Sequence, residues 1–191
     1  LMLLYQDMKE KILGKLGDYE IVFVDDGSGD NSWDIMQEIK EMDDRVVLVR
    51  LSRNFGEHAA LLAGLSCCSG DCAVTKQADL QEDSELILEL YESWKKGNKV
   101  VLAVREERDD KLIYKWFANL YYVIVRKLIM PDMPKGGFDC YLLDRKAIDV
   151  LLMLDERNSS LSLQVLWMGF QTDKVYFHRK AREVGESRWT M

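Results

Sequence analysis

The sequence contains little proline, little histidine and no long apolar run. Its 191 residues include two prolines, two histidines and twelve glycines, so neither a collagen-like repeat nor a disordered linker is expected. No apolar stretch reaches the roughly 18 residues of a membrane-spanning helix. The four cysteines (Cys67, Cys68, Cys72, Cys140) form no CxxC pair, and no histidines lie at finger spacing, which excludes the common zinc modules. We expect buried, reduced thiols, as in a reducing cytoplasm.

Acidic residues outnumber basic ones, 33 to 26, and the formal net charge is −7. A chain with this balance lacks the basic face that nonspecific nucleic-acid binding needs, so we expect no nucleic-acid partner. Charged residues follow the apolar segment Leu1–Leu4 at once, and we expect no signal peptide. Length and composition therefore predict one soluble, cytoplasmic domain over residues 1–191.

Apolar segments in the first half alternate between strand-like runs and helical spacing. The run from Glu20 to Val24 is typical of a strand buried on both faces, whereas Leu4, Met8 and Ile12 recur every four residues as in a helix. We expect strands over residues 20–24, 45–51, 72–75 and 99–105, with one helix between each consecutive pair. Short connections of this kind imply right-handed crossovers and an α/β fold, with a mainly parallel sheet and helices on both faces.

The pattern changes after Arg105. We expect a long aromatic helix over residues 112–129, a loop over 133–139, an extended stretch over 140–143, helices over 145–154 and 160–168, and a last strand over 174–178. The aromatic helix either lies along a membrane surface or packs in the core or an oligomer interface. This half of the chain is expected to close a site over the sheet.

Polar residues follow the first expected strand at the point where it ends. In open parallel sheets, ligands bind at the carboxyl ends of the strands, and this strand ends in Asp25-Asp26-Gly27. Two adjacent carboxylates after an apolar run cost free energy unless they bind something. A turn with a helix cap is the alternative, although Asp30 and Ser32 can supply that cap without them.

The later strand ends add cations, amides and another carboxylate. They comprise Arg53 after the second strand, Gln77, Asp79 and Gln81 after the third, and Arg105 and Arg108 after the fourth. A lone carboxylate near a diphosphate commonly holds one divalent cation, with phosphates and water completing its shell. The basic end of the chain, which includes Arg182, Arg188 and Trp189, could close over a phosphate as a lid. Together these residues predict a nucleotide-diphosphate site with one metal.

Five short motifs that occur in one order carry a family resemblance. They are Val24-Asp-Asp-Gly-Ser28, Ser52-Arg-Asn-Phe-Gly56, Ala78-Asp-Leu-Gln81, Leu142-Leu-Asp-Arg145 and Gly185-Glu-Ser-Arg-Trp189. The set resembles family 2 glycosyltransferases of the GT-A fold, a Rossmann-like α/β fold. Within that family it is most similar to the polyprenyl- and dolichol-phosphate mannosyl- and glucosyltransferases. The resemblance runs from about residue 3 to the end of the sequence.

The resemblance implies a role for each matching residue. Asp26, with Asp25 beside it, would contact the base or ribose of the donor nucleotide. Asp79 would hold Mg²⁺ or Mn²⁺ against the donor diphosphate, with Gln81 next to that site, and Asp139 would act on the acceptor. Basic residues that resemble the family's phosphate contacts are Arg105, Arg108, Arg182 and Arg188.

Two departures from the family pattern bear on the reaction. Gln77 stands where the Asp-x-Asp motif of the family has its first acid, so one carboxylate must suffice for the metal. The sequence also begins in the family's first helix. We therefore expect the strand before that helix, and any membrane segment after Met191, to lie outside these residues.

The implied reaction is the inverting transfer of a sugar from a UDP- or GDP-linked donor to an acceptor, expected to be a polyprenyl phosphate. The metal and the arginines would stabilise charge on the leaving diphosphate. Self-association and contact with the cytoplasmic face of a membrane are further expectations. The alternative is a non-catalytic sugar-nucleotide-binding or scaffold protein, which Gln77 and the absent strand favour.

Overall fold

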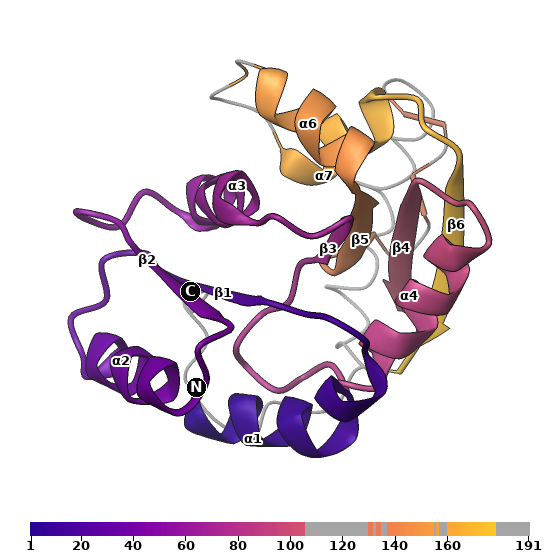
Figure 1. Ribbon diagram of the computed structural model, residues 1–191. Coiled ribbons are helices and arrows are strands. Elements are labelled where there is room, and N and C mark those ends of the chain that lie inside the picture. Colours follow the sequence, from indigo (N-terminus) through magenta and orange to yellow (C-terminus); the bar gives the residue numbers. More distant parts are fainter. Residues whose placement is uncertain (106–129, 132, 135–136, 155, 157–159, 179–191) are drawn as a thin grey trace, which may run out of the picture.

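The strands form two sheets, and only one of them is wholly parallel. The computed structural model describes residues 1–105, 130–131, 133–134, 137–154, 156 and 160–178. In the first sheet, β1 (Ile21–Asp25) and β2 (Val46–Arg50) pair in parallel. The second sheet has the order β3-β5-β4-β6 and consists of β3 (Cys72–Val74), β5 (Tyr141–Asp144), β4 (Val100–Arg105) and β6 (Thr172–Phe177). Figure 1 shows β1 and β2 beside this second sheet.

The strand β5 corrects the expected topology. It lies between β3 and β4 and runs antiparallel to both, so β3 and β4 are not the parallel neighbours that the sequence predicts. In the described part of this sheet, the parallel pair is β4 with β6. All four residues of β5 are buried, which suits the centre of a sheet covered on both faces. A short apolar stretch after a long connection gives no sign of where in the sheet it inserts.

Helices cover both faces of the sheets, as expected. α1 (Met2–Lys11), followed by the 3-10 turn Leu13–Lys15, and α2 (Ser32–Met42) lie below β1 and β2 in Figure 1, whereas α3 (Glu57–Cys67) lies above them. α4 (Leu86–Lys95) covers one face of the second sheet, and α6 (Arg145–Met153) and α7 (Leu161–Trp167) cover the other. The helices expected over 57–68, 145–154 and 160–168 are confirmed within one residue at each end. The helix expected over 112–129 lies outside the described residues.

The core is centred on β4. Val100, Leu102 and Val104 pack towards α3, α6 and α7, whereas Val101 and Ala103 pack towards α4. Each of these five side chains is buried. Complete burial of a valine or leucine stabilises a fold by about 1.5–3 kcal/mol, so this strand is a main source of stability.

A buried acid, Asp43, ties α1 to the turn that precedes β2. Its carboxylate accepts hydrogen bonds from the Tyr5 hydroxyl at 3.3 Å and the Tyr19 hydroxyl at 3.1 Å. It also accepts bonds from the Arg45 backbone N–H at 3.0 Å and from Arg45 Nε at 2.9 Å. The hydrogen bonds of the Arg45 side chain lower the pKa of Asp43 from 3.8 to about 2.

We expect Asp43→Asn to destabilise the fold by about 2 kcal/mol at neutral pH. Because the folded pKa lies below the unfolded one, this stabilisation is complete above pH 3.8 and is lost as the pH falls towards 2. Urea unfolding at pH 7 and at pH 2.5 measures the difference, which should shrink at the lower pH. The exposed neighbour Asp44 is the matched control, and an equal effect of Asp44→Asn would contradict this role.

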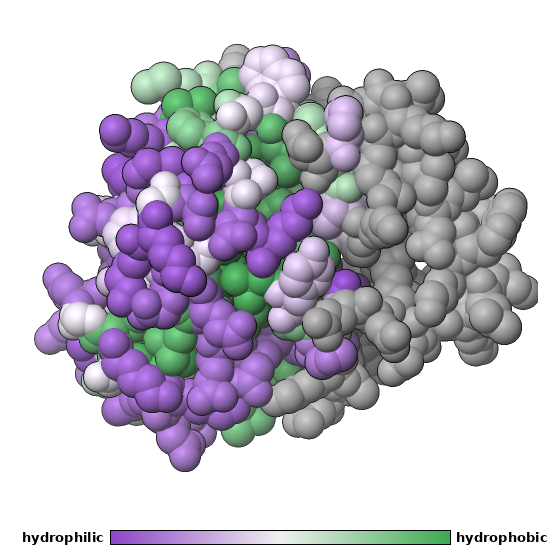
Figure 2. All heavy atoms as spheres, turned by 90° about the vertical axis from the view of Figure 1, so that its right-hand side faces the viewer, coloured by the Kyte–Doolittle hydropathy of each residue, from purple (hydrophilic) through white to green (hydrophobic). Residues whose placement is uncertain are grey.

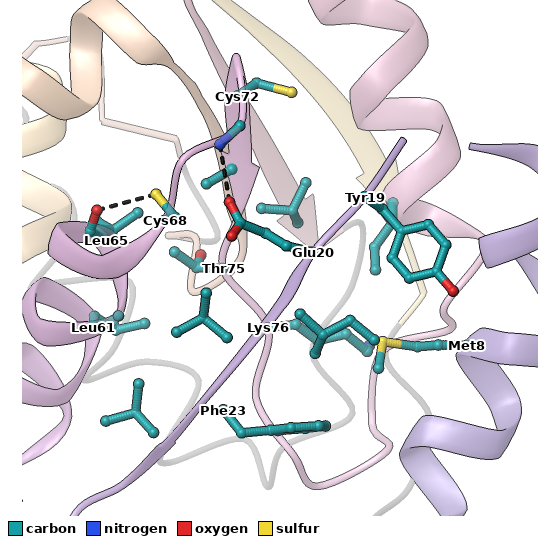
Figure 3. Close-up of a pocket in the computed structure, with 18 of the residues that line it drawn as sticks. Met8, Tyr19, Glu20, Phe23, Leu61, Leu65, Cys68, Cys72, Thr75 and Lys76 are labelled. Atoms are coloured by element: carbon teal, nitrogen blue, oxygen red, sulfur yellow. Dashed lines mark hydrogen bonds between the residues drawn. The ribbon is translucent and has the colours of Figure 1, made fainter. Parts of the chain in front are cut away.

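A cavity of about 510 Å³ lies between β1 and β3 (Figure 3). Mostly apolar side chains from α1, β1, α3 and β3 line it, among them Met8, Phe23 and Leu61. In the described chain β1 pairs with β2 alone and β3 with β5 alone, so the two strands face each other across this space without pairing. Glu20 Oε1 links them at one end by accepting the backbone N–H groups of Ser69 at 2.5 Å and Gly70 at 2.9 Å.

The cysteines are all free thiols, but they are not all buried. Cys140 is buried and Cys68 and Cys72 are half-buried, whereas Cys67 is exposed, which contradicts the expectation for that residue. Burial, with a smaller contribution from the charge of Asp144, raises the pKa of Cys72 to about 11. Cys72 is therefore protonated at neutral pH. No helix in the described ranges has the length and apolar composition to cross a bilayer.

Candidate functional site

The carboxyl ends of β1 and β4 carry the polar residues that the sequence predicts for a site. Asp25 is the last residue of β1 and Arg105 the last residue of β4. Since β5 runs antiparallel to β4 and Tyr141 pairs with Leu102, the residues that precede β5 return to the edge where β4 ends. Asp139 therefore lies at this edge although it comes before a strand.

Both carboxylate oxygens of Asp25 contact residues of the chain near the end of β1. Its side chain is buried, and Oδ1 accepts the Ser28 backbone N–H at 2.8 Å. Oδ2 lies 3.3 Å from Nε of Arg50, the residue that pairs with Asp25 across β2. These contacts support the alternative of a structural turn for Asp25, whereas its predicted contact with a nucleotide stays a prediction.

Asp26 joins two of the sequence motifs. Oδ1 accepts the Phe55 backbone N–H at 2.7 Å, and Oδ2 accepts that of Gly56 at 2.9 Å. Both oxygens of one carboxylate thus hold the loop that leads into α3. The role of Asp26 at the nucleotide stays a prediction. Its two hydrogen bonds hold the residues that directly precede α3, so they help to fix where this helix begins.

The loop held by Asp26 exposes a cation stacked on an aromatic ring. The Arg53 guanidinium lies 4.1 Å from the centre of the Phe55 ring, and Nη1 donates to the Asn54 carbonyl oxygen at 3.2 Å. Phe55 is 49% exposed. Flat guanidinium and aromatic faces can both stack on a planar base, so Phe55 joins Arg53 as a candidate contact that the sequence did not single out.

Gly27 lets these two loops approach each other. Its φ is +68°, and a Cβ built there would lie 2.5 Å from the Arg53 carbonyl carbon. An alanine would therefore meet both a disfavoured backbone conformation and a backbone clash that no side-chain rotation relieves.

We expect Gly27→Ala to lower the free energy of unfolding by about 3 kcal/mol. Gly29, in the same turn, has open space around the position of a Cβ, so Gly29→Ala should change stability by less than about 1 kcal/mol. Urea unfolding of the two variants provides the comparison. Equal effects at both positions would show that the contact with the Arg53 backbone is unimportant.

Glu57, the first residue of α3, connects this loop to the end of β3. The Gln77 side-chain Nε2 donates to Glu57 Oε1 at 2.9 Å. A series of contacts therefore runs from Asp26 through Gly56 and Glu57 to Gln77. Glu57 was not among the predicted site residues, because nothing in its sequence position indicates that α3 begins opposite residue 77.

The loop after Gln77 holds Asp79 in a defined turn. Asp79 Oδ1 accepts the Gln81 backbone N–H at 3.2 Å, and Leu80 between them has φ +58°, a conformation that costs non-glycine residues free energy. The Lys76 ammonium group fixes the ends of the turn by donating to the Glu82 carbonyl oxygen at 2.7 Å. Glu82 is buried, with 4% of its surface exposed. The carboxylate of Asp79 is thus presented by a constrained turn.

The side chains of Gln77 and Asp79 could contribute an amide oxygen and a carboxylate oxygen to a cation whose other ligands come from the donor and water. Carboxylate and amide oxygens are hard donors of the kind that Mg²⁺ and Mn²⁺ accept. No group of three histidine, cysteine, aspartate or glutamate side chains gathers as a metal site in the described ranges. One carboxylate and one amide oxygen are compatible with a cation whose remaining ligands come from a diphosphate and water.

Arg105 and Asp139 form an ion pair between Nη2 and Oδ2. The Arg105 side chain is 13% exposed, and that of Asp139 is 44% exposed. Asp139 also lines the cavity together with Glu57 and Gln77. The arginine expected to contact phosphate and the acid expected to act on the acceptor are therefore partners. Of the other predicted residues, Arg108, Arg182, Arg188 and Trp189 lie outside the described residues.

Solved structures resemble the fold of this chain. Alignment with 4-diphosphocytidyl-2C-methyl-D-erythritol synthase from Anaerococcus prevotii gives a TM-score of 0.58 at 15% identity, covering 90% of this chain and 75% of that one. Alignment with the bifunctional IspDF of Campylobacter jejuni gives 0.56 at 11% identity, covering 92% and 42%. At these identities the likeness concerns the fold alone, and it agrees with the expected GT-A-like α/β architecture.

Curated relatives are closer in sequence. An uncharacterized glycosyltransferase of Bacillus subtilis is 37% identical over 98% of this chain and 58% of its own length. A bactoprenol glucosyl transferase of Shigella phage SfV is 34% identical over 97% and 61%, and an undecaprenyl-phosphate 4-deoxy-4-formamido-L-arabinose transferase of Pseudomonas fluorescens is 34% identical over 91% and 51%. The chain thus spans between half and about three fifths of these relatives. The model of glycosyl transferase family 2 matches residues 5–152, and the chain belongs to that family.

Proposed function

We propose that this chain binds a nucleotide diphosphate sugar and transfers its sugar, with inversion, to a polyprenyl phosphate. The observation that carries the proposal is the series of contacts from Asp26 through Gly56 and Glu57 to Gln77, which joins the ends of β1 and β3 beside Asp79. Family membership supports sugar transfer. The names of the bactoprenol and undecaprenyl-phosphate transferases support a lipid phosphate as the acceptor.

In the proposed reaction, an oxygen of the acceptor attacks the anomeric carbon opposite the diphosphate, which leaves with the bonding electrons. Mg²⁺ or Mn²⁺ would supply charge stabilisation at the diphosphate, and Asp79 with Gln77 would hold it. Asp139, oriented by Arg105, would position the acceptor. A lipid phosphate is already anionic near neutral pH, so the acceptor needs little help in losing a proton.

We further propose that one more strand completes the fold between β1 and β3. α1 and α2 lie on one face of β1 and β2, whereas α3 lies on the other (Figure 1). Right-handed crossovers place two helices on one face when the chain moves across the sheet in one direction, so a strand before α1 would lie on the β3 side of β1. The cavity between β1 and β3, which Leu1 helps to line, lies on that side of β1.

A protein that transfers sugar to a lipid phosphate would act at the cytoplasmic face of a membrane, where the lipid acceptor is held.

Thermal unfolding of the 191-residue chain tests donor binding. At about a hundredfold excess over Kd, UDP or GDP with Mn²⁺ should raise the midpoint by about 5 °C, and an adenine dinucleotide should not. A shift with either nucleotide, but no hydrolysis or transfer of any linked sugar, would favour the sugar-nucleotide-binding scaffold. The absence of any shift would contradict the proposal.

A further inference from the structure

The side chain of Glu57, an acidic residue, forms no ion pair with any described residue. It is exposed at the start of α3, and it lines the cavity between β1 and β3 together with Gln77 and Asp139. Within the described ranges, the polar contact of its side chain is the 2.9 Å hydrogen bond from Gln77 Nε2. The two bonds of Asp26 to the loop before α3 fix the place from which Glu57 projects.

The hydrogen bond to Glu57 fixes the orientation of the Gln77 amide. Nε2 faces Glu57, so Oε1, on the other side of the same planar group, faces away from it. Neither Gln77 Oε1 nor Glu57 Oε2 accepts a hydrogen bond from the described part of the chain. Within the described residues, one carbonyl oxygen of Gln77 and one carboxylate oxygen of Glu57 therefore accept no hydrogen bond, and Gln77 lies two residues before Asp79 in the chain.

A nucleotide diphosphate at this edge would meet the negative charges of Glu57 and Asp79. Like charges at short range oppose binding unless a cation lies between them. Carboxylate and carbonyl oxygens are ligands that Mg²⁺ and Mn²⁺ accept, and a second charge near the cation would strengthen its binding. The position of Glu57 is thus unfavourable for a diphosphate alone and favourable for a diphosphate with its cation.

We propose that Glu57 is a positioning residue for the cation. Its carboxylate holds the Gln77 amide so that the carbonyl oxygen stays available to the metal, and it adds the negative charge that a glutamine at position 77 lacks. The inference rests on the proposed function, because it assumes a cation-bound diphosphate at this edge. It assigns a role to a residue outside the motifs that carry the family resemblance.

Mn²⁺ binding in the presence of saturating UDP or GDP tests this role without relying on catalysis. Electron paramagnetic resonance of free Mn²⁺ gives the Kd once the Mn²⁺ bound by the nucleotide alone has been measured separately and subtracted. Glu57→Gln keeps the size of the side chain and an oxygen that can accept the Gln77 N–H, but it removes the charge, and it should weaken Mn²⁺ binding about 10-fold. Adding Gln77→Met to Glu57→Gln should weaken binding further, because it removes the amide oxygen that is proposed as a ligand. Glu38→Gln, an equal charge change on the exposed side of α2, should leave the Kd unchanged.

Each result supports or overturns the proposal. Glu57→Asp, which keeps the charge, should recover part of the affinity, whereas a merely structural role would lower the thermal unfolding midpoint instead. One outcome overturns only the role of Glu57. In that outcome the wild-type chain binds Mn²⁺ with the nucleotide, Asp79→Asn abolishes this binding, and Glu57→Gln leaves it unchanged. If the wild-type chain binds no Mn²⁺ with either nucleotide, both this role and the metal-dependent donor site are overturned.

Discussion

Replacing Asp79 with asparagine should lower sugar transfer about 1,000-fold while the chain stays folded. The asparagine keeps an oxygen that can accept the Gln81 backbone N–H, now bonded to Asp79 Oδ1 at 3.2 Å, so the turn should survive. What would be lost is the negative charge that we propose lies next to the donor diphosphate, where stabilisation of developing charge is usually the largest catalytic contribution. Steady-state transfer rates and thermal unfolding of the same preparation measure the two effects.

Asp34→Asn, the same chemical change on the exposed side of α2, is the control for this prediction. It should transfer sugar at the wild-type rate. If Asp79→Asn keeps more than a tenth of wild-type activity at saturating donor and Mn²⁺, the proposal that Asp79 binds the metal is wrong.

Replacing Asp139 with asparagine should lower turnover about 100-fold and change donor affinity less than about threefold. Asp139 is the more exposed member of its ion pair with Arg105 and lines the cavity, where we propose that it positions the acceptor. Asparagine keeps the shape but carries no charge, so it cannot form the ion pair with Arg105, and the acceptor would lose the group that is proposed to orient it. Initial rates with varied acceptor, combined with equilibrium binding of the donor, separate turnover from affinity.

The outcome for Asp139 discriminates between two roles. A fall in donor affinity as large as the fall in turnover would show that the Arg105–Asp139 pair serves the donor diphosphate. An unchanged turnover would remove Asp139 from the mechanism. Asp149→Asn, on the exposed surface of α6, controls for the charge change.

The first half of the fold could be predicted because its elements carry local signals. Strand β4 is an uninterrupted apolar run, and α3 begins after Gly56 and ends near Ser69-Gly70, so their bounds follow from the sequence. The place of β5 could not be predicted, because sheet order depends on contacts between residues far apart in the chain. Val74 pairs with Leu142, and no short-range pattern records such a pairing.

The sequence indicates candidate site residues, whose roles stay predictions, but it does not indicate the hydrogen bonds that join them. Strand ends indicated Asp26, Gln77 and Asp79, because parallel strands bring their carboxyl ends to one edge. The bonds from Asp26 to Phe55 and Gly56 span about 30 residues of sequence, and the bond from Gln77 to Glu57 spans 20. Such bonds depend on how two loops approach each other, so the sequence indicates neither the bonds of Asp26 to the loop before α3 nor the contact of Gln77 with Glu57.

The most direct test of the central claim is the transfer itself. The protein expressed from its gene would be incubated with labelled UDP- and GDP-sugars, undecaprenyl phosphate and Mn²⁺, and the lipid products would be identified by mass spectrometry. We predict one sugar joined to the lipid phosphate with inverted anomeric configuration, a product that disappears when Mn²⁺ is chelated and when Asp79 is replaced with asparagine. Donor binding without any labelled lipid or free sugar, across the whole set of donors, would contradict the account.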